Sequence, residues 1–309
     1  MKLALIALLL SATSAAAFPV TVKSCNRDVT FDAAPAAAIS NDVNLTEMML
    51  VLGLRDRMVG YTGISGWKTL DPEMREGVAE LPELSAKYPT KEVLAGADAD
   101  FFFAGWNYGM KVGGEVTPET LEPLAIKTYE LTESCIFVGA KAKSSMDDMY
   151  NDILNLGMIF GVEDKANALV EGYKTRLAEV TAGVDHANPL RVFVYDSGED
   201  TPFTAGKYAI PTALIEAAGG VNIMEDLDKS WATVAWEPVV ERNPQVIIIV
   251  NYGDVTAEQK IAFMKGNPAF VGIDAVKNDR FVVLEYVEAT PGPRNIKAVE
   301  KLVAGFAAQ

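Results

Sequence analysis

The side chains best suited to chemistry in this sequence are aromatic and polar groups that follow predicted strands. Trp106, Asn107 and Tyr108 come directly after the apolar run Asp100–Ala104, at the carboxyl end of that strand. Open α/β sheets hold ligands at these strand ends, flat rings stack on conjugated or macrocyclic ligands, and arginine pairs with anionic groups. Taken singly, each ring could also pack in a core. We predict a ligand site with the following members: Trp67, Tyr88, Trp106, Asn107, Tyr108, Ser197, Tyr208, Trp231, Tyr286 and Arg294.

Catalytic chemistry has little support in the residue types. The single histidine, His186, lies in the Gly183–Pro189 link, where a solvated loop residue is far commoner than a general base. No nucleophile elbow, phosphate-binding loop or dinucleotide fingerprint stands between a strand and a helix. The His and Cys clusters that transition metals require are missing as well. We therefore expect no enzyme, no metal site and no resident cofactor, although a bound ligand could itself carry iron or cobalt.

The amino-terminal residues are typical of an exported protein. Met1 and Lys2 precede the apolar run Leu3–Leu10, and Ala15 to Ala17 form a cleavage motif of small residues. This is the pattern of a secretory signal peptide, and the run is much shorter than the roughly 20 residues of a membrane-spanning helix. We predict cleavage after Ala17 and a periplasmic mature protein.

Charge and cysteine content restrict the partners and the compartment. The formal net charge of −15 argues against nucleic acid, because phosphate binding needs clustered Lys and Arg. The two cysteines, Cys25 and Cys135, would sit in an oxidising compartment, where disulfides persist. We predict a disulfide between them, although sequence alone does not show that their Cα atoms approach.

Short apolar runs alternate with helical spacing in two stretches of the chain, as at Asn44–Tyr61 and Arg191–Val250. Such alternation is typical of parallel α/β sheets. Between the two stretches, apolar residues at steps of three and four predict helices from Ser145 to about Ala182, with a break near Gly161. We predict a signal peptide (1–17), a ligand-binding lobe (18–145), linker helices (146–184) and a second ligand-binding lobe (185–309).

The most specific stretch runs from Trp231 to Ile248 and reads Trp-Ala-Thr-Val-Ala-Trp-Glu-Pro-Val-Val-Glu-Arg-Asn-Pro-Gln-Val-Ile-Ile. Together with Val51–Gly60, Pro202–Gly206 and Ala218–Ile223, it resembles the periplasmic substrate-binding proteins of ferric-siderophore and vitamin B12 (cobalamin) ABC transporters. The resemblance implies two parallel-sheet α/β lobes joined by one long α-helix, a ligand held between them, and an ABC transporter permease as partner.

The resemblance also implies two acidic side chains that dock on the permease. Glu237 matches the acid of the second lobe. In the first lobe, the family's Asn-x-Glu-x-Ile pattern becomes Pro89–Val93, so that Lys91 stands where the acid is expected and Glu92 stands beside it. We predict Glu92 and Glu237 as the docking acids.

Ligand identity stays open among several chemical classes. Trp231, Trp106 and Arg294 match cleft positions of the family, and a dense aromatic set suits an iron siderophore, cobalamin, haem or a flat heterocycle such as a deazaflavin precursor. A secreted α/β enzyme and a two-lobed receptor that meets no permease are the competing interpretations. We expect a monomer that binds a small molecule and no nucleic acid.

Overall fold

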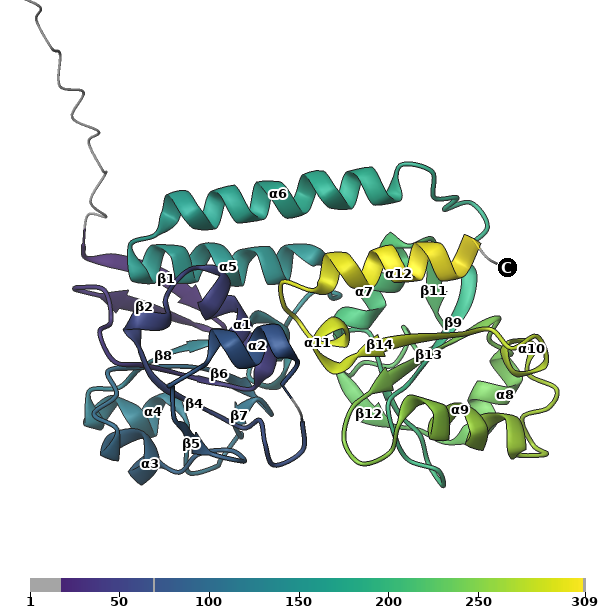
Figure 1. Ribbon diagram of the computed structural model, residues 1–309, viewed down its shortest axis with the longest axis horizontal. Coiled ribbons are helices and arrows are strands. Elements are labelled where there is room, and N and C mark those ends of the chain that lie inside the picture. The colour runs from purple at the N-terminus through teal and green to yellow at the C-terminus, as the bar shows by residue number, and fades with distance from the viewer. Residues whose placement is uncertain (1–17, 69, 308–309) are drawn as a thin grey trace, which may run out of the picture.

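The structure is a computed structural model that describes residues 18–68 and 70–307. Figure 1 shows two α/β lobes side by side, with α5 (Met146–Phe160) and α6 (Glu163–Thr181) running along one side of them. The predicted signal peptide, residues 1–17, lies outside the described residues.

The first lobe is built on a parallel sheet with the strand order β5-β4-β3-β6-β7, to which β8 adds by pairing with β6. Every residue of the apolar strand β6 is buried, as expected for a parallel strand covered on both faces. An antiparallel ribbon, β1-β2, precedes the sheet. The bounds are β1 Val20–Ser24, β2 Arg27–Phe31, β3 Ala38–Asn41, α1 Val43–Val51, η1 Arg55–Arg57, β4 Met58–Thr62, α2 Pro72–Gly77, β5 Glu83–Ser85, α3 Lys91–Gly96, β6 Phe101–Trp106, β7 Gly109–Met110, α4 Pro118–Leu121, η2 Glu122–Leu124, β8 Lys127–Glu130 and η3 Thr132–Phe137.

The second lobe repeats the plan with a smaller parallel sheet in the order β11-β9-β13-β14. A short antiparallel pair, β10-β12, lies beside this sheet. The bounds are β9 Leu190–Tyr195, β10 Phe203–Ala205, α7 Ile210–Ala217, β11 Gly220–Asn222, β12 Trp231–Thr233, α8 Trp236–Arg242, β13 Val246–Asn251, α9 Ala257–Gly266, α10 Asp274–Lys277, β14 Phe281–Glu285, α11 Tyr286–Ala289 and α12 Asn295–Ala307.

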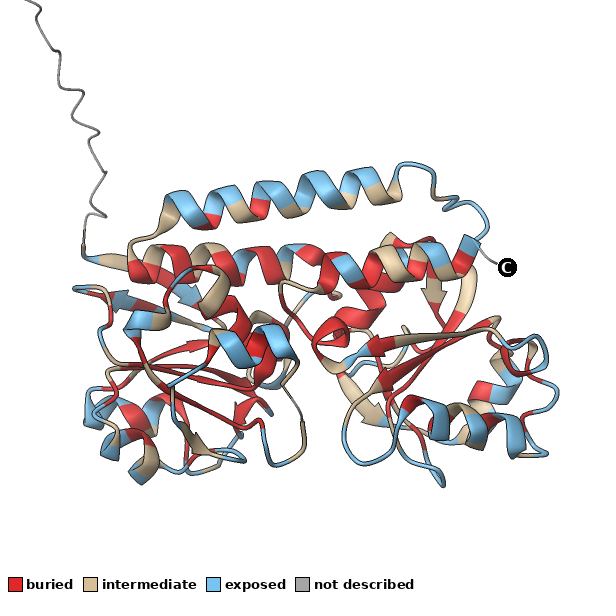
Figure 2. Ribbon diagram, viewed as in Figure 1, coloured by how far each residue is buried: buried red, intermediate tan, exposed pale blue. Residues whose placement is uncertain are grey.

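The connection between the lobes is a pair of antiparallel helices. Gly161 ends α5 in the left-handed conformation (φ 68°), which glycine adopts without a steric penalty, and the chain returns as α6. Figure 2 shows that α5 is largely buried, whereas the outer helix α6 is mostly exposed. The carboxyl-terminal helix α12 packs against both α6 and α7, so the end of the chain also helps to hold the second lobe to the linker.

The predicted fold class is confirmed, because both sheets are parallel α/β sheets and no strand in the described part of the chain pairs across the lobes. The predicted break at Gly161 lies between α5 and α6. Across residues 18–68 and 70–307, no helix is long and apolar enough to cross a bilayer.

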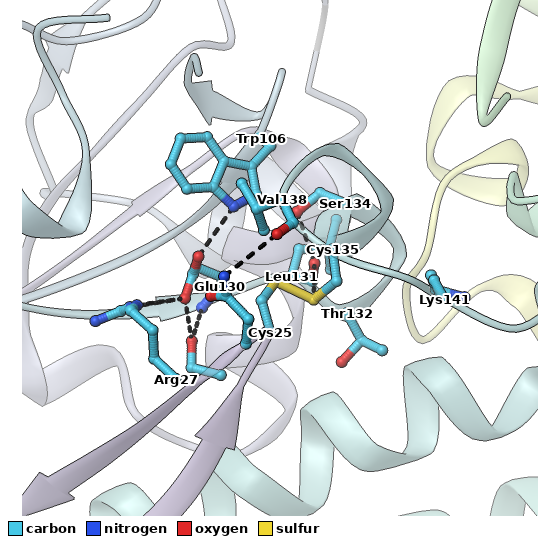
Figure 3. Close-up of a disulfide and its surroundings, with 12 residues drawn as sticks. Cys25, Arg27, Trp106, Glu130, Leu131, Thr132, Ser134, Cys135, Val138 and Lys141 are labelled. Carbon is cyan, nitrogen blue, oxygen red and sulfur yellow. Dashed lines mark hydrogen bonds and ion pairs between the residues drawn. A yellow bond between two sulfur atoms is a disulfide. The ribbon is translucent and has the colours of Figure 1, made fainter. Parts of the chain in front are cut away.

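The predicted disulfide between Cys25 and Cys135 is confirmed, with their Cα atoms 5.0 Å apart (Figure 3). It joins the turn of the β1-β2 ribbon to η3. Beside it, the buried carboxylate of Glu130 accepts hydrogen bonds from Ser24 Oγ and Arg27 Nη2, both at 2.7 Å. The ribbon is therefore held to the first lobe by a covalent bond and by a charged network.

Candidate functional site

A cavity of about 550 Å³ lies between the two lobes, within the size range of pockets that enclose small-molecule ligands. Eight of its lining residues are aromatic, and both lobes contribute rings. The lining residues are Asp42, Trp67, Lys68, Tyr88, Asn107, Tyr108, Phe137, Asp196, Phe203, Ser230, Trp231, Val250, Tyr252, Tyr286, Ala289 and Thr290.

Asp42 forms a charged centre in the first-lobe wall. It caps α1 with φ 76° and ψ 159°, a conformation that is nearly restricted to glycine and costs about 1–3 kcal/mol. Its carboxylate accepts hydrogen bonds from Val43 N (2.6 Å), Lys68 Nζ (2.5 Å) and Tyr286 OH (2.8 Å). Burial lowers the pKa of Lys68, and the Asp42 charge opposes that shift. Strained residues of this kind cluster at functional sites.

A tight turn between β6 and β7 presents Asn107 and Tyr108 to the cavity. Asn107 has φ 64° and Gly109 has φ 103°, both in the region that Asn and Gly tolerate best. A Cβ atom at Gly109 would lie 2.7 Å from Asn41 Cγ, so this position requires glycine. Tyr88 donates its hydroxyl hydrogen to the Asn107 carbonyl oxygen, and its ring meets Trp67 edge-on at 5.4 Å.

In the second lobe, Asp196 follows β9 and is only 4% exposed. Its Oδ1 accepts hydrogen bonds from Ser197 Oγ and Tyr252 OH, both at 2.8 Å. Burial raises the pKa of Asp196, although these two bonds and nearby Lys260 oppose the shift. Lys260 donates to the carbonyl oxygens of Asp196 (2.5 Å) and Val250 (2.6 Å) and so supports the strand ends from behind.

The antiparallel pair β10-β12 supplies an aromatic platform. The rings of Phe203 and Trp231 are stacked, with centroids 5.8 Å apart and planes inclined by 21°. Trp231 Nε1 is buried and has no hydrogen-bond partner. This platform lines the same cavity as Trp67 and Tyr88 of the first lobe, so that a flat ligand could contact rings of both lobes.

Two buried carboxyl groups have pKa values in the range of general bases, and neither acts on the cavity directly. Burial raises the pKa of Glu133 and of Asp152 to about 7 in each case. Glu133 accepts hydrogen bonds from Tyr108 OH (3.1 Å) and Ile210 N (2.5 Å), whereas Asp152 binds Thr132 and Tyr129. Neither carboxyl is among the lining residues. Both shifts therefore have a structural explanation.

Six of the ten predicted ligand residues line this cavity: Trp67, Tyr88, Asn107, Tyr108, Trp231 and Tyr286. Trp231 was expected in a loop but lies in the short strand β12, and Tyr286 begins α11 directly after β14.

Trp106, predicted as a ligand residue, does not line this cavity. It is the last residue of β6 rather than the first residue of the loop, so strand alternation turns it to the face of Phe102 and Ala104. Its Nε1 donates to Glu130 Oε1 at 2.9 Å (Figure 3). The side chain thus belongs to the buried network beside the disulfide.

Arg294, predicted as a partner for an anionic ligand, does not line this cavity either. Its Nε donates to Glu47 Oε1 at 2.6 Å and its Nη1 donates to Asp71. These two acids belong to α1 and to the cap of α2 in the first lobe. Arg294 therefore connects the two lobes by ion pairs.

Ser197 and Tyr208 are not among the lining residues either. The Ser197 hydroxyl donates to Asp196, which lines the cavity in its place. The hydroxyl of Tyr208 donates to Asp228 Oδ1 at 2.5 Å. Ser197 therefore supports a lining residue, whereas Tyr208 bonds to a residue that does not line the cavity.

The prediction missed several lining residues, including Asp42, Lys68, Asp196, Phe203 and Tyr252. Three of them could have been found by their position at strand ends, because Asp42, Asp196 and Tyr252 directly follow β3, β9 and β13. No sequence signal marks Lys68 or Phe203.

The predicted docking acids lie in different lobes, on α3 and α8. Glu92 and Glu237 are both exposed in the first turns of these helices, and Figure 1 places both helices on the side of the lobes away from α6. In the described part of the chain, no group of three or more His, Cys, Asp or Glu side chains is arranged to hold a metal ion.

Two α/β lobes, joined by a helical linker and enclosing an aromatic cavity, define a two-lobed solute-binding protein. The chain belongs to the family described as periplasmic binding protein, whose model matches residues 39–287.

The following relatives are named as binding proteins. The chain is 24% identical to the ABC transporter substrate-binding lipoprotein YvrC of Bacillus subtilis, over 92% of this chain and 84% of the relative. It is also 24% identical to the vitamin B12-binding protein of Pectobacterium atrosepticum, over 89% of this chain and 90% of the relative. Among solved structures, a periplasmic binding protein from Veillonella parvula superimposes with a TM-score of 0.81 and 28% identity, over 96% of this chain and 99% of that chain.

Proposed function

We propose that this protein is the substrate-binding component of an ABC importer. It captures a large aromatic or chelate ligand, of the iron-siderophore or cobalamin kind, between its lobes and delivers it to a permease. The observation that carries this proposal is the cavity of about 550 Å³ between the lobes, lined by eight aromatic residues. Rings at this density provide large flat contact areas for a conjugated or macrocyclic ligand.

The two-sided construction of the cavity supports a capture-and-release mechanism. Trp67 and Tyr88 come from the first lobe, and Phe203 and Trp231 come from the second. A ligand that contacts both walls stabilises the closed arrangement of the lobes, because it gains contacts there that the open arrangement lacks. The permease can then distinguish loaded from empty protein by the relative placement of the lobes.

Compartment, oligomeric state and lack of catalysis belong to the same proposal. The protein is exported to the periplasm with its leader cleaved after Ala17, acts as a monomer and catalyses no reaction. The disulfide between Cys25 and Cys135 supports the oxidising compartment. The family match to binding proteins supports the absence of catalysis.

The test is native mass spectrometry of the full chain after expression with its own leader and purification from the periplasm. We expect one protein chain per particle and a non-covalent small molecule, with an amino terminus at Phe18. A Trp231→Ala variant prepared in parallel should lose most of the co-purifying ligand. Purification without any ligand, together with failure to bind corrinoids, ferric siderophores or haem, would contradict the proposal.

A further inference from the structure

The tyrosine hydroxyls of the cavity all donate their hydrogens to the protein. The four bonds are Tyr88 to the Asn107 carbonyl oxygen, Tyr108 to Glu133 (3.1 Å), Tyr252 to Asp196 (2.8 Å) and Tyr286 to Asp42 (2.8 Å). A phenol that has donated its hydrogen has only oxygen lone pairs left for a ligand. These tyrosines therefore act toward a ligand as hydrogen-bond acceptors.

The positive charges near the cavity are neutralised or engaged by the protein itself. Lys68 is the one basic side chain among the lining residues that the structure describes, and its ammonium lies 2.5 Å from Asp42 Oδ2. Lys260 stands behind the wall and donates to two backbone carbonyl oxygens. Arg294, predicted as the partner of an anion, is paired with Glu47 and Asp71. Lys87 is exposed and does not line the cavity, and its ammonium lies 5.9 Å from the Trp67 ring. Among the lining residues that the structure describes, a ligand carboxylate or phosphate would therefore find no unpaired cation.

Asp196 adds an acceptor with unused capacity. Both hydrogen bonds that it accepts through its side chain end on Oδ1, and Oδ2 accepts none from the described residues. A second cavity of about 410 Å³ shares Lys68, Tyr252 and Tyr286 with the first and is also lined by Asp71, Glu258 and Glu285. Acidic side chains beside the ligand cavity repel anions and attract cations.

From these three observations, we propose that the cavity selects an uncharged or cationic conjugated ligand, which donates N–H or O–H groups to Asp196 and to the tyrosine oxygens. This inference rests on the proposed binding function and narrows its ligand class. It disfavours ligands that depend on carboxylate or phosphate groups for recognition. It also disfavours direct metal ligation by tyrosinate, because burial and the neighbouring Asp42 and Asp196 charges raise the pKa values of Tyr252 and Tyr286.

The test compares probes that share a skeleton and differ in charge. Riboflavin and its 5′-phosphate have the same flat ring, and haemin dimethyl ester and haemin have the same porphyrin but differ in two carboxylates. Isothermal titration of the purified full chain should show at least about tenfold tighter binding of riboflavin than of its phosphate, or of the dimethyl ester than of haemin, since a buried unpaired charge is costly.

Tighter or equal binding of the anionic members overturns the inference, and so does failure of both uncharged probes to bind. Neither result overturns the proposed binding function, which is decided separately by whether the protein from the periplasm carries a small molecule.

Two variants test the role of Asp196. Asp196→Asn keeps the shape and removes the charge, and it should weaken the bound uncharged probe by about tenfold, the loss expected for one hydrogen bond to a charged group. Asp200→Asn, an exposed acid on the same lobe, should leave the affinity unchanged. If Asp196→Asn does not fold by circular dichroism, Tyr252→Phe removes a neighbouring acceptor oxygen and serves in its place. Unchanged affinity in a folded variant of either position overturns the inference.

Discussion

Trp231 and Trp106 illustrate how one residue type takes two roles at strand ends. Trp231 stacks on Phe203 in the cavity wall, whereas Trp106 donates to the buried carboxylate of Glu130. The difference follows from which face of its strand each ring occupies. Substitution of the two residues should therefore affect different properties.

Trp231→Ala should weaken ligand binding by about 1 kcal/mol or more beyond the loss of buried area, because it removes a stacking surface. The thermal midpoint should change little in the absence of ligand, since Trp231 is only partly buried. Calorimetric titration with the co-purified ligand measures the first effect. Normal affinity in this variant would show that the ligand does not lie on the β10-β12 platform.

Trp106→Phe should lower the unfolding free energy by about 1–3 kcal/mol, because Glu130 loses one donor while it stays buried. Ligand affinity should remain that of the unsubstituted protein. Urea denaturation and titration on the same sample separate the two effects. A clear loss of ligand affinity without loss of stability would show that Trp106 contributes to ligand binding.

Arg294→Met should destabilise the protein by about 3 kcal/mol, since it leaves the buried Glu47 carboxylate without its cation. Burial already raises the pKa of Glu47, and the Arg294 hydrogen bond and charge oppose that shift. The double variant with Glu47→Gln should recover part of the loss in a denaturation experiment. No recovery would mean that the pair contributes through something other than its charges.

At the scale of elements, the contact between η3 and α7 joins the two lobes behind the cavity. Glu133 of η3 accepts a hydrogen bond from the backbone N–H of Ile210, the first residue of α7. It also accepts from Tyr108, which lines the cavity. The carboxyl group therefore connects the ligand wall of one lobe with a helix of the other.

This contact predicts a pH dependence of stability. Burial raises the pKa of Glu133 to about 7, so between pH 4.5 and 7 the folded protein holds a proton that the unfolded chain has released. The unfolding free energy should fall as pH rises through this window, by at most about 3 kcal/mol. Asp152, whose pKa burial also raises to about 7, adds a decline of the same sign.

Urea denaturation at pH 5, 6, 7 and 8 measures this decline. Glu133→Gln should remove about half of it and Asp152→Asn the other half, because neither replacement titrates. An unsubstituted protein whose stability is flat from pH 5 to 8 would show that these carboxyl groups keep ordinary pKa values.

At the scale of the whole molecule, the amino-terminal ribbon is fixed by a disulfide that closes 110 residues of chain. The Cys25→Ser, Cys135→Ser double variant should lose about 2–5 kcal/mol of stability, mainly because the unfolded chain becomes less restricted. The thermal midpoint of the unsubstituted protein should fall toward that of the variant when a reductant is added. Equal thermal midpoints for the oxidised unsubstituted protein and the double variant would show that the disulfide does not stabilise the fold.

Transport should depend on surfaces far from the cavity. Glu237→Ala should reduce uptake into vesicles that contain the permease and leave ligand affinity unchanged, because Glu237 is exposed on α8 and does not line the cavity. Glu241→Ala, at an exposed position one turn later, is the matched control and should transport normally. A loss of ligand affinity in Glu237→Ala would place this residue in binding rather than docking.

The sequence by itself determined the alternation of strands and helices, the break at Gly161 and six of the residues that line the cavity. These features depend on short-range patterns: apolar spacing, a glycine with φ 68°, and polar or aromatic residues at strand ends, as with Tyr108. Parallel strands end at the same edge of a sheet. Residues at these ends can therefore be predicted to lie close together even when their individual contacts are unknown.

Only the tertiary structure decided which partner each polar side chain takes. Arg294 stands next to α12 in the sequence, yet it pairs with Glu47 and Asp71, which are more than 200 residues away. Trp106 points away from the cavity because it is the last residue of β6 rather than a loop residue. The end of β6 depends in turn on its pairing with β7, which joins Trp106 to Met110. The physical reason is that the spacing of residues along the chain determines on which face of a helix or strand a side chain lies. The charge and polarity of the groups that this face meets depend on how the lobes pack.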